Sequence, residues 1–471
     1  METVAPNKPQ KINESFRDSI ATVDQQGRRN FLFPKKPKGR LYNKRTIASL
    51  VYLAVFFTLP FLKVQGEPLF LFNVIERKFI FFGQIFWPQD FFIFAVGFLT
   101  FTVFVILFTV VFGRVFCGWA CPQTIFMEMV FRKIEYWLDG DSSAQKRLHD
   151  MPWNGYKIRK RAVKIGVFYA LSFLIANFAL SYVIGMDNVE LMIREGVGRH
   201  PVTFSALIGF TTVFFFVFYW FREQACLVVC PYGRLQGVLL DRKSMVVAYD
   251  YVRGEPRGKV NKTKEAADLG DCIDCAACVR VCPTGIDIRN GTQLECTNCT
   301  ACIDACDAIM HSLQRMEGLI RIDSEENIAR GQSKLWNTRT KAYSGLLLLL
   351  LAVLVTLLVT RNDVDATVLR TPGQIFQTQP DGRLSNIFTI KFANKTRKDI
   401  PMTLKLENMS GEIQVVGSSL LAPRESYAQA PFFVKLKRDQ VVRRKTKLLI
   451  GVYEGTKRIK TVETTFFGPG Y

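Results

Sequence analysis

The sequence predicts a polytopic α-helical membrane protein with about five spans, an inserted α+β module, and an all-β sandwich at the C-terminal end. Three observations predict this fold class. Long stretches without charge recur along the chain, cysteines crowd into one polar loop, and the C-terminal part changes to short runs of alternating apolar residues. With 49% apolar residues, the 471-residue chain fits a membrane protein with appended domains better than a set of soluble domains.

Stretches that contain no Asp, Glu, Lys or Arg predict the membrane spans, because a spanning helix needs about 20 apolar residues. We expect spans at 46–62, 91–113, 165–186, 201–221 and 342–360. The aromatic segment 68–89 is interrupted by Glu76, Arg77 and Lys78. We therefore interpret it as an interfacial or re-entrant piece and not as a sixth span.

The distribution of basic residues predicts the orientation of the spans. Lysines and arginines gather before the first span and in 114–162, whereas the loop 187–200 carries only Arg194 and Arg199. Cytoplasmic loops carry an excess of Lys and Arg, so we expect the N-terminus inside and the C-terminus outside. The segment before the first span is too long and too polar for a secretory signal, so we expect no cleavage.

The expected domain organisation follows from these spans. We predict a basic cytoplasmic segment 1–45, a membrane domain 46–241 with four spans, a cytoplasmic module 242–341, a fifth span 342–360 and an exported domain 361–471. The net charge of +21 raises the question of nucleic acid. The cations flank the spans, where membrane lipid and orientation account for them, so we predict a lipid environment and no nucleic-acid partner.

Eight cysteines form the strongest motif of the chain. The run from Cys272 to Pro283 has the spacing C-x2-C-x2-C-x3-C-P, and a second run repeats it with Asp307 in place of the proline. Two-cluster bacterial ferredoxins have this spacing, and the fourth cysteine of each run binds the other cluster. We therefore predict two [4Fe-4S] clusters in a ferredoxin-like module, one held by Cys272, Cys275, Cys278 and Cys306, the other by Cys282, Cys296, Cys299 and Cys302.

A pair of zinc sites is the main alternative for these cysteines. Zinc bound by four cysteines also uses C-x2-C pairs. It does not require three thiols within seven residues followed by a fourth, so the spacing favours clusters. The change of proline to Asp307 leaves ligation intact and can alter solvent access to the nearest cluster.

The other four cysteines form two copies of a C-x3-C-P motif, each just past an uncharged span. The copies are Cys117 to Pro122 and Cys226 to Pro231. The spacing predicts that the two sulfurs of each copy lie on one helix face, with the proline in a first helical turn. Such pairs can bind a soft ion such as Cu(I) or act as redox dithiols. Alternatively, these cysteines pack as small apolar residues, but the duplication of the motif argues against this interpretation.

Other cofactor classes lack their sequence signals. The chain has three histidines, and none is paired with another at ligand spacing, so haem within the membrane is not expected. No Rossmann or P-loop glycine pattern is present, so electrons must arrive from a partner or from quinol. The stretch 123–138 alternates as an amphipathic helix does, and we expect it to lie on the cytoplasmic surface.

The C-terminal part predicts an immunoglobulin-like sandwich. Alternating apolar runs occur at 387–392, 403–406, 433–436 and 447–453, with a turn signal at 380–382. About seven short strands in some hundred residues are typical of this architecture. This part contains neither Cys nor His, so we expect a docking or structural role.

The motifs together resemble those of the CcoG family, also called FixG or RdxA, which are accessory proteins of cbb3-type cytochrome oxidases. The resemblance covers nearly the whole chain, including the sandwich. It rests on both cysteine runs, both C-x3-C-P motifs and the segments 28–34, 114–124, 222–233, 254–258 and 318–325.

The resemblance implies a multi-pass protein of the bacterial inner membrane, with a periplasmic C-terminal domain, that reduces Cu(II) to Cu(I) at the cytoplasmic side. Copper, as substrate or transient ligand, would lie at the catalytic thiols. The resemblance further implies oxidase assembly factors and a copper transporter or chaperone as partners; the sequence does not name the electron donor. The thiols in question are Cys117, Cys121, Cys226 and Cys230.

Two other functional classes stay open at this point. One is a quinol-oxidising electron carrier for a periplasmic reductase, similar to membrane ferredoxins of nitrate and nitrous-oxide reduction that share the paired C-x3-C-P motif. The sandwich argues against it, because those families lack this domain or carry a flavin domain. The other is an oxidase assembly scaffold whose clusters are structural or sensory.

Overall fold

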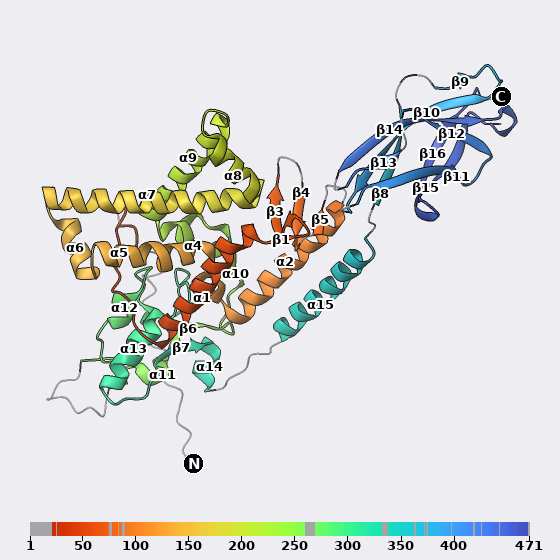
Figure 1. The fold of residues 1–471 in the computed structure, drawn as a ribbon. Helices are drawn as coiled ribbons and strands as arrows, with labels where there is room; N and C mark the ends of the chain where they lie inside the picture. Colours follow the sequence, from red (N-terminus) through yellow and green to blue (C-terminus); the bar gives the residue numbers. More distant parts are fainter. Residues whose placement is uncertain are drawn as a thin grey trace, which may run out of the picture. The chain divides into compact units, whose positions relative to one another are not determined.

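The computed structural model describes residues 21–24, 26–74, 78–82, 84–86, 90–259, 269–331, 338–361, 364–371, 373, 375–396, 398–417, 420–424, 426–441 and 443–469. The chain forms two compact units (Figure 1). One comprises Met1–Lys63 and Phe98–Leu351, and the other comprises Val64–Gly97 and Ala352–Tyr471.

The five predicted spans are confirmed as helices that are long and apolar enough to cross a membrane. They comprise Arg40–Phe61 (α1 Arg40–Thr58 with η2 Leu59–Phe61), Phe91–Phe112 (α2), Gly155–Ile184 (α7), Pro201–Phe221 (α9 Pro201–Phe216 with η5 Val217–Phe221) and Thr338–Val359 (α15). Helix α7 begins ten residues before the expected span, because the side chain of Asn154 accepts a hydrogen bond from the backbone N–H of Lys157 at 2.9 Å. Its first turns are polar and lie outside the apolar stretch.

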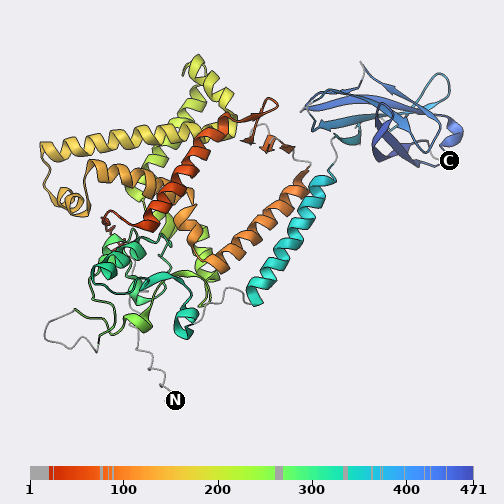
Figure 2. The ribbon, with the colours of Figure 1, turned by 60° about the horizontal axis from the view of Figure 1, so that its bottom comes forward.

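The membrane helices of the first unit pack through aromatic side chains. Helix α7 contacts α9 and also the short helix α8 (Met186–Glu195), and all three are seen together in Figures 1 and 2. Phe131, Phe168 and Phe218 are almost fully buried between these helices. The rings of Phe131 and Phe218 stack with their centroids 4.8 Å apart, a geometry that adds to the stabilisation from burial.

The stretch 123–138 corrects our expectation of a surface helix. It is helical as α4 (Pro122–Thr124), the π-helix η4 (Ile125–Phe131) and α5 (Arg132–Leu138). Its charged residues Arg132 and Glu135 are each only 2% exposed, and its apolar residues Ile125 and Phe126 are also buried, so protein encloses both faces. Amphipathic spacing identifies two faces but does not say which one faces water, and here buried ion pairs cover the polar face.

The cysteine-rich module surrounds a two-stranded sheet. Strand β6 (Val246–Tyr249) pairs antiparallel with β7 (Ile320–Asp323), and helices α12 (Ala277–Val281) and α13 (Ala301–Ser312) contact each other. The core of the module contains apolar side chains from these strands and loops beside the cysteines. Short helices α3 (Val115–Trp119), α6 (Ser142–Asp150), α10 (Pro231–Leu239), α11 (Tyr251–Gly254), η6 (Ala225–Val229), η8 (Ile288–Asn290) and α14 (Glu325–Arg330) complete the unit.

The two cysteine runs follow the same backbone path. Asp274 and Ala276 in the first run have φ values of 52° and 53°, and Asn298 and Thr300 in the second have 52° and 64°. Residues other than glycine rarely adopt this left-handed conformation. Its repetition at equivalent positions shows that each run wraps around its own cavity before it enters a helix.

The first span is tied to the module by one carboxylate. Asp304 on α13 accepts hydrogen bonds from the backbone N–H groups of Leu41 at 3.0 Å and Tyr42 at 2.7 Å. These are donors of the first turn of α1 that would otherwise lack a partner. Asp304 therefore caps α1 across the interface, and α1 lies beside α13 in both views (Figures 1 and 2).

The C-terminal domain confirms the predicted immunoglobulin-like sandwich. One sheet has the order β12-β14-β10-β8 with β9 paired to β10, and the other has the order β13-β11-β15-β16. Phe388, Phe432, Ile450 and Phe466 fill the space between the sheets and are fully buried. The strands are β8 (Val364–Arg370), β9 (Gln377–Thr378), β10 (Leu384–Asn394), β11 (Ile400–Leu406), β12 (Gly411–Val415), β13 (Leu421–Ala422), β14 (Tyr427–Leu436), β15 (Lys445–Glu454) and β16 (Lys457–Phe467).

The segment 68–89 forms strands and is not a sixth spanning helix. β3 (Phe70–Asn73), β4 (Lys78–Phe81) and β5 (Gln84–Phe86) pair in sequence order, and two short strands, β1 (Lys63–Val64) and β2 (Glu67–Pro68), precede them. Glu76 and Arg77 lie outside the described residues. Asp90, which follows, pairs with Arg361 and Lys395 at 2.6 Å each, and this buried ion group links the segment to the sandwich.

Candidate redox site

Two cavities in the cysteine-rich module collect the eight cysteines of the two runs. The first cavity has about 350 Å³ of empty space, and the second has about 340 Å³. Cys278 lines both, so the cavities adjoin. The other cysteines of the first cavity are Cys282, Cys296, Cys299 and Cys302, and those of the second are Cys272, Cys275 and Cys306.

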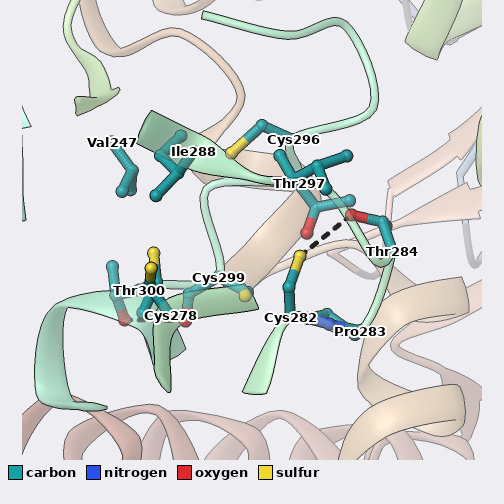
Figure 3. Close-up of a pocket in the computed structure, with 12 residues that line it drawn as sticks. Val247, Cys278, Cys282, Pro283, Thr284, Ile288, Cys296, Thr297, Cys299 and Thr300 are labelled. Atoms are coloured by element: carbon teal, nitrogen blue, oxygen red, sulfur yellow. Dashed lines mark hydrogen bonds between the residues drawn. The ribbon is translucent and has the colours of Figure 1, made fainter. Parts of the chain in front are cut away.

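The chemistry of both cavities fits an iron-sulfur cluster. Figure 3 shows the sulfur atoms of Cys282, Cys296 and Cys299 turned toward the space between them, and the walls include Val247 and Ile288. The last cysteine of each run lines the cavity of the other run, which is the crossover that two-cluster ferredoxins use. The first cavity is thus lined by five thiols and the second by four, each set drawn from both runs and held inside a largely apolar wall.

Burial makes these thiols depend on a metal partner. Burial, together with neighbouring thiols, raises the pKa of Cys278 to about 11 and those of Cys296 and Cys306 to about 12. Without a positive partner these three cysteines are therefore neutral at pH 7. Bound iron supplies the positive charge that stabilises four thiolates in one cavity.

Hydrogen bonds to the sulfurs differ between the two cavities. The hydroxyl Oγ1 of Thr284 lies 3.3 Å from Sγ of Cys282 in the first cavity, which Figure 3 marks with a dashed line. In the second cavity, the hydroxyl of Tyr249 donates to Oε1 of Glu255 at 3.2 Å, and burial and the nearby Cys272 raise the pKa of Tyr249. Hydrogen bonds to cluster sulfurs help to set the reduction potential, so we expect the two clusters to differ in reduction potential.

Replacing Thr284 with valine is expected to lower the midpoint potential of one cluster by about 40 mV, which corresponds to about 1 kcal/mol for one electron. The Thr284 hydroxyl can donate to the cluster thiolate, and this bond stabilises the reduced, more negative state more strongly. A redox titration followed by EPR measures both midpoints. The other cluster is the internal control, and equal shifts of both midpoints would contradict the assignment.

Asp307 has a structural role at the position where ferredoxins carry proline. Its Oδ1 accepts a hydrogen bond from the backbone N–H of Gly318 at 2.9 Å, two residues before strand β7 begins. Burial raises the pKa of the Asp307 carboxyl. Asp307 thus holds the loop that closes the second cavity.

The C-x3-C-P motifs do not have the helical geometry that their spacing predicts. Helix α3 ends at Trp119, and Cys121 is extended, with ψ 126°, just before Pro122 opens α4. Cys230 is likewise extended, with ψ 111°, just before Pro231 opens α10. The prediction that both sulfurs share one helix face is therefore wrong, because a residue before proline is driven out of the helical conformation. The placement of both prolines at a first helical turn is confirmed.

The four thiols of the two motifs lie in one region of the structure. Burial, together with the charges of Cys121, Cys117 and Cys230, raises the pKa of Cys226 to about 12, so all four lie within electrostatic range of one another. The Sγ of Cys117 donates to Oε1 of Gln236 at 3.0 Å. Within the described part of the chain, no three His, Cys, Asp or Glu side chains converge tightly enough to hold a single metal ion.

A buried ion network beside the motifs was missed by sequence reasoning. Glu135 pairs with Lys164 at 2.5 Å and with Arg222, and Glu223 pairs with Arg132 at 3.4 Å. The network joins the helix after Cys121 to the segment before Cys226, and Arg222 itself has a strained φ of 51°. The charged residues were visible in the sequence, but nothing in their spacing indicated burial. The full set is Arg29, Glu128, Arg132, Glu135, Asp139, Lys164, Arg222 and Glu223.

Comparison with known families agrees with this site. A family described as a 4Fe-4S dicluster domain matches residues 221–325, and one described as a 4Fe-4S binding domain matches 94–141. The IG-like fold at the C-terminal of FixG matches 354–469.

Several proteins resemble the chain over most of its length. Protein RdxA of Cereibacter sphaeroides is 33% identical over 394 residues, which cover 81% of this chain and 83% of that protein. Nitrogen fixation protein FixG of Rhizobium meliloti is 32% identical over 435 residues, which cover 83% of this chain and 82% of that protein. Protein RdxB of Cereibacter sphaeroides is 32% identical over 389 residues, with coverage of 79% and 81%.

The fold and the site define a multi-pass membrane protein that carries iron-sulfur clusters and transfers electrons as an oxidoreductase. Five apolar helices, two adjoining cysteine cavities and a C-terminal sandwich together mark this class. The chain belongs to the FixG and RdxA family.

Proposed function

We propose that this protein reduces Cu(II) to Cu(I) on the cytoplasmic side of the bacterial inner membrane and so supplies copper for assembly of a cbb3-type cytochrome oxidase. The observation that carries the proposal is the position of the two thiol pairs beside the cluster module: Gly118, next to Cys117, meets the carbonyl of Thr297, and Cys117 donates to Gln236 of the helix that follows Cys230. Thiolates stabilise Cu(I), the product of the reaction, more than they stabilise Cu(II). An iron-sulfur cluster gives up one electron at a time, which matches a one-electron metal reduction.

The eight cysteines of the two cavities are the proposed cluster ligands. One [4Fe-4S] cluster is held by the four thiols of the second cavity, and the other by the second-run thiols together with Cys282. When bound, the clusters supply one-electron redox chemistry. The chain's own residues enclose them in apolar walls, donate hydrogen bonds to their sulfurs and position the copper-binding thiols Cys117, Cys121, Cys226 and Cys230.

The proposed topology has the N-terminus and the cluster module in the cytoplasm and the sandwich in the periplasm. The basic residues of 114–162 support this orientation, because cytoplasmic loops are rich in Lys and Arg. Copper reduction then takes place on the cytoplasmic side. Oxidase assembly factors and a copper transporter or chaperone are the proposed partners, and the electron donor is a separate redox partner.

An anaerobic titration tests the proposal. Protein reduced with dithionite and freed of excess reductant is titrated with Cu(II), and cluster absorbance and chelated Cu(I) are measured together. Two one-electron clusters are expected to yield about two Cu(I) per protein as their colour returns. Iron analysis should give about eight iron atoms per chain, whereas about twelve would place a third cluster at the four thiols. Cluster reduction by quinol with no oxidation by Cu(II) would favour an electron carrier, and redox-inactive clusters would favour a scaffold.

A further inference from the structure

We propose that the two clusters act in a fixed order, and that the cluster of the first cavity passes its electron to the C-x3-C-P thiols across a backbone contact at Gly118. This inference rests on the proposed function. It specifies which cluster passes its electron directly to copper, and which residue holds that cluster's loop against the first motif. The cluster of the second cavity then receives electrons from the external donor.

Gly118 lies where the first motif touches the second cysteine run. A Cβ atom at Gly118 would lie 2.5 Å from the carbonyl oxygen of Thr297 and 2.8 Å from that of Asn298. Both residues stand between the cluster cysteines Cys296 and Cys299, and Gly118 directly follows Cys117. Only glycine allows this approach, because any side chain would overlap the backbone of the loop.

Neighbouring contacts hold the same two segments together. Arg114 is buried and donates through Nη1 to the carbonyl of Leu294 and through Nε to Oε1 of Gln236 at 3.2 Å. The same Gln236 oxygen accepts from Cys117 at 3.0 Å. Arg114 and Gln236 are thus positioning residues that join the first motif, the helix after the second motif and the loop of the first cavity.

The contact at Gly118 reaches the lining of the first cavity and not that of the second. Neither lining includes a residue of α3, α4, η6 or α10, but Thr297, which Gly118 meets, lines only the first cavity. Because Cys278 lines both cavities, an electron can pass between them over a short distance. The rate of electron transfer falls steeply with distance, so the first cavity is the one suited to serve the motif thiols.

The proposed step balances with a single electron. One electron leaves the reduced cluster of the first cavity, which becomes oxidised, and Cu(II) at the motif thiols takes it up and becomes Cu(I). No bond breaks, and the step requires no proton. An electron from the second cavity then restores the first cluster to its reduced state.

A paramagnetic probe tests this order without turnover. The reduced protein is loaded with Co(II), which binds thiolates, or with diamagnetic Zn(II) as control, and the EPR saturation of each cluster is measured. Thr284→Val identifies the signals, because it shifts the midpoint of the first-cavity cluster and leaves that of the other cluster unchanged. Co(II) should speed the relaxation of the Thr284-linked cluster more than that of the other. Equal effects or the reverse order would overturn the inference.

Failure of the underlying function gives a different result in the same experiment. Cobalt bound to thiolates absorbs visible light, and this band should vanish when the four motif cysteines are replaced by serine. A protein that shows no such band has no metal site at the motifs, and both proposals fall. If the band appears but Co(II) speeds the relaxation of the other cluster more, only the proposed order of the clusters is wrong.

Gly118→Ala tests the contact itself. The added methyl group must push the Thr297 loop away, so oxidation of the clusters by Cu(II) should slow by about tenfold or more, as small misplacements do elsewhere. Gly166→Ala in α7 is the matched control, since a Cβ there meets nothing within 4 Å. Unchanged stopped-flow rates in Gly118→Ala with both clusters assembled would contradict the role of Gly118. If that variant loses its clusters, the Co(II) experiment on the unsubstituted protein decides.

Discussion

Replacing Cys117, Cys121, Cys226 and Cys230 with serine is expected to abolish reduction of Cu(II) while both cluster EPR signals remain. The four motif thiols are separate from the two cluster cavities, so the clusters should assemble and accept electrons from dithionite. Serine oxygens are hard ligands that stabilise Cu(I) poorly, so the product state is lost. The measurement is Cu(I) formation with a chelator, followed beside EPR of the reduced protein.

Two further variants sharpen this result. Cys306→Ser serves as a control for the EPR assay, because it removes a proposed ligand of the second cavity and should eliminate or alter one cluster signal. The double variant of Cys226 and Cys230 retains the other motif and is expected to keep part of the activity. Full activity in the variant without any motif thiol would refute a copper site there.

Replacing Glu135 with glutamine is expected to destabilise the protein by about 3–5 kcal/mol, the range found when one partner of a buried ion pair is removed. Glu135 is 2% exposed and pairs with both Lys164 and Arg222, so its loss leaves buried positive charge without compensation. Thermal unfolding in detergent measures the change. Glu190→Gln is the matched control, because its exposed pair with Arg194 contributes at most about 1 kcal/mol.

The ion pairs of Glu135 also predict that the stability of the protein falls in acid. Burial raises the pKa of Glu135, but Arg222 and Lys164 outweigh burial and lower the pKa from 4.5 to about 2. Its contribution is therefore present above pH 4.5 and is lost as the pH falls toward 2. Glu135→Gln should be less sensitive to acid over this interval. An identical acid sensitivity in both proteins would show that the pair does not stabilise the fold.

The sequence carried much of the candidate site because cluster ligands follow a spacing rule. The runs from Cys272 and from Cys296 have to place three thiols around one cavity, and only a short fixed spacing can do so. The crossover of Cys282 and Cys306 follows from the same rule, and the two cavities are lined accordingly. A ligand spacing of this kind can be recognised in a single sequence.

Inferences about faces and interfaces failed for a common reason. Periodicity in 123–138 indicated two faces, yet the charged face is buried by Lys164 and Arg222, which are distant in the sequence. The C-x3-C spacing suggested one helix face, but Pro122 and Pro231 break each helix at the second cysteine. Both errors arise where a local pattern permits more than one arrangement and distant partners choose between them.

The class of this protein, with five apolar spans, two cluster-binding runs and a sandwich, follows from its residues alone, because length, hydropathy and ligand spacing are local properties. How these parts contact one another became evident from the folded structure. In the sequence, nothing distinguishes Gly118 from an ordinary helix residue. In the fold, it lies against the carbonyl of Thr297. Contacts between segments so far apart depend on packing of the whole unit, and no local pattern encodes them.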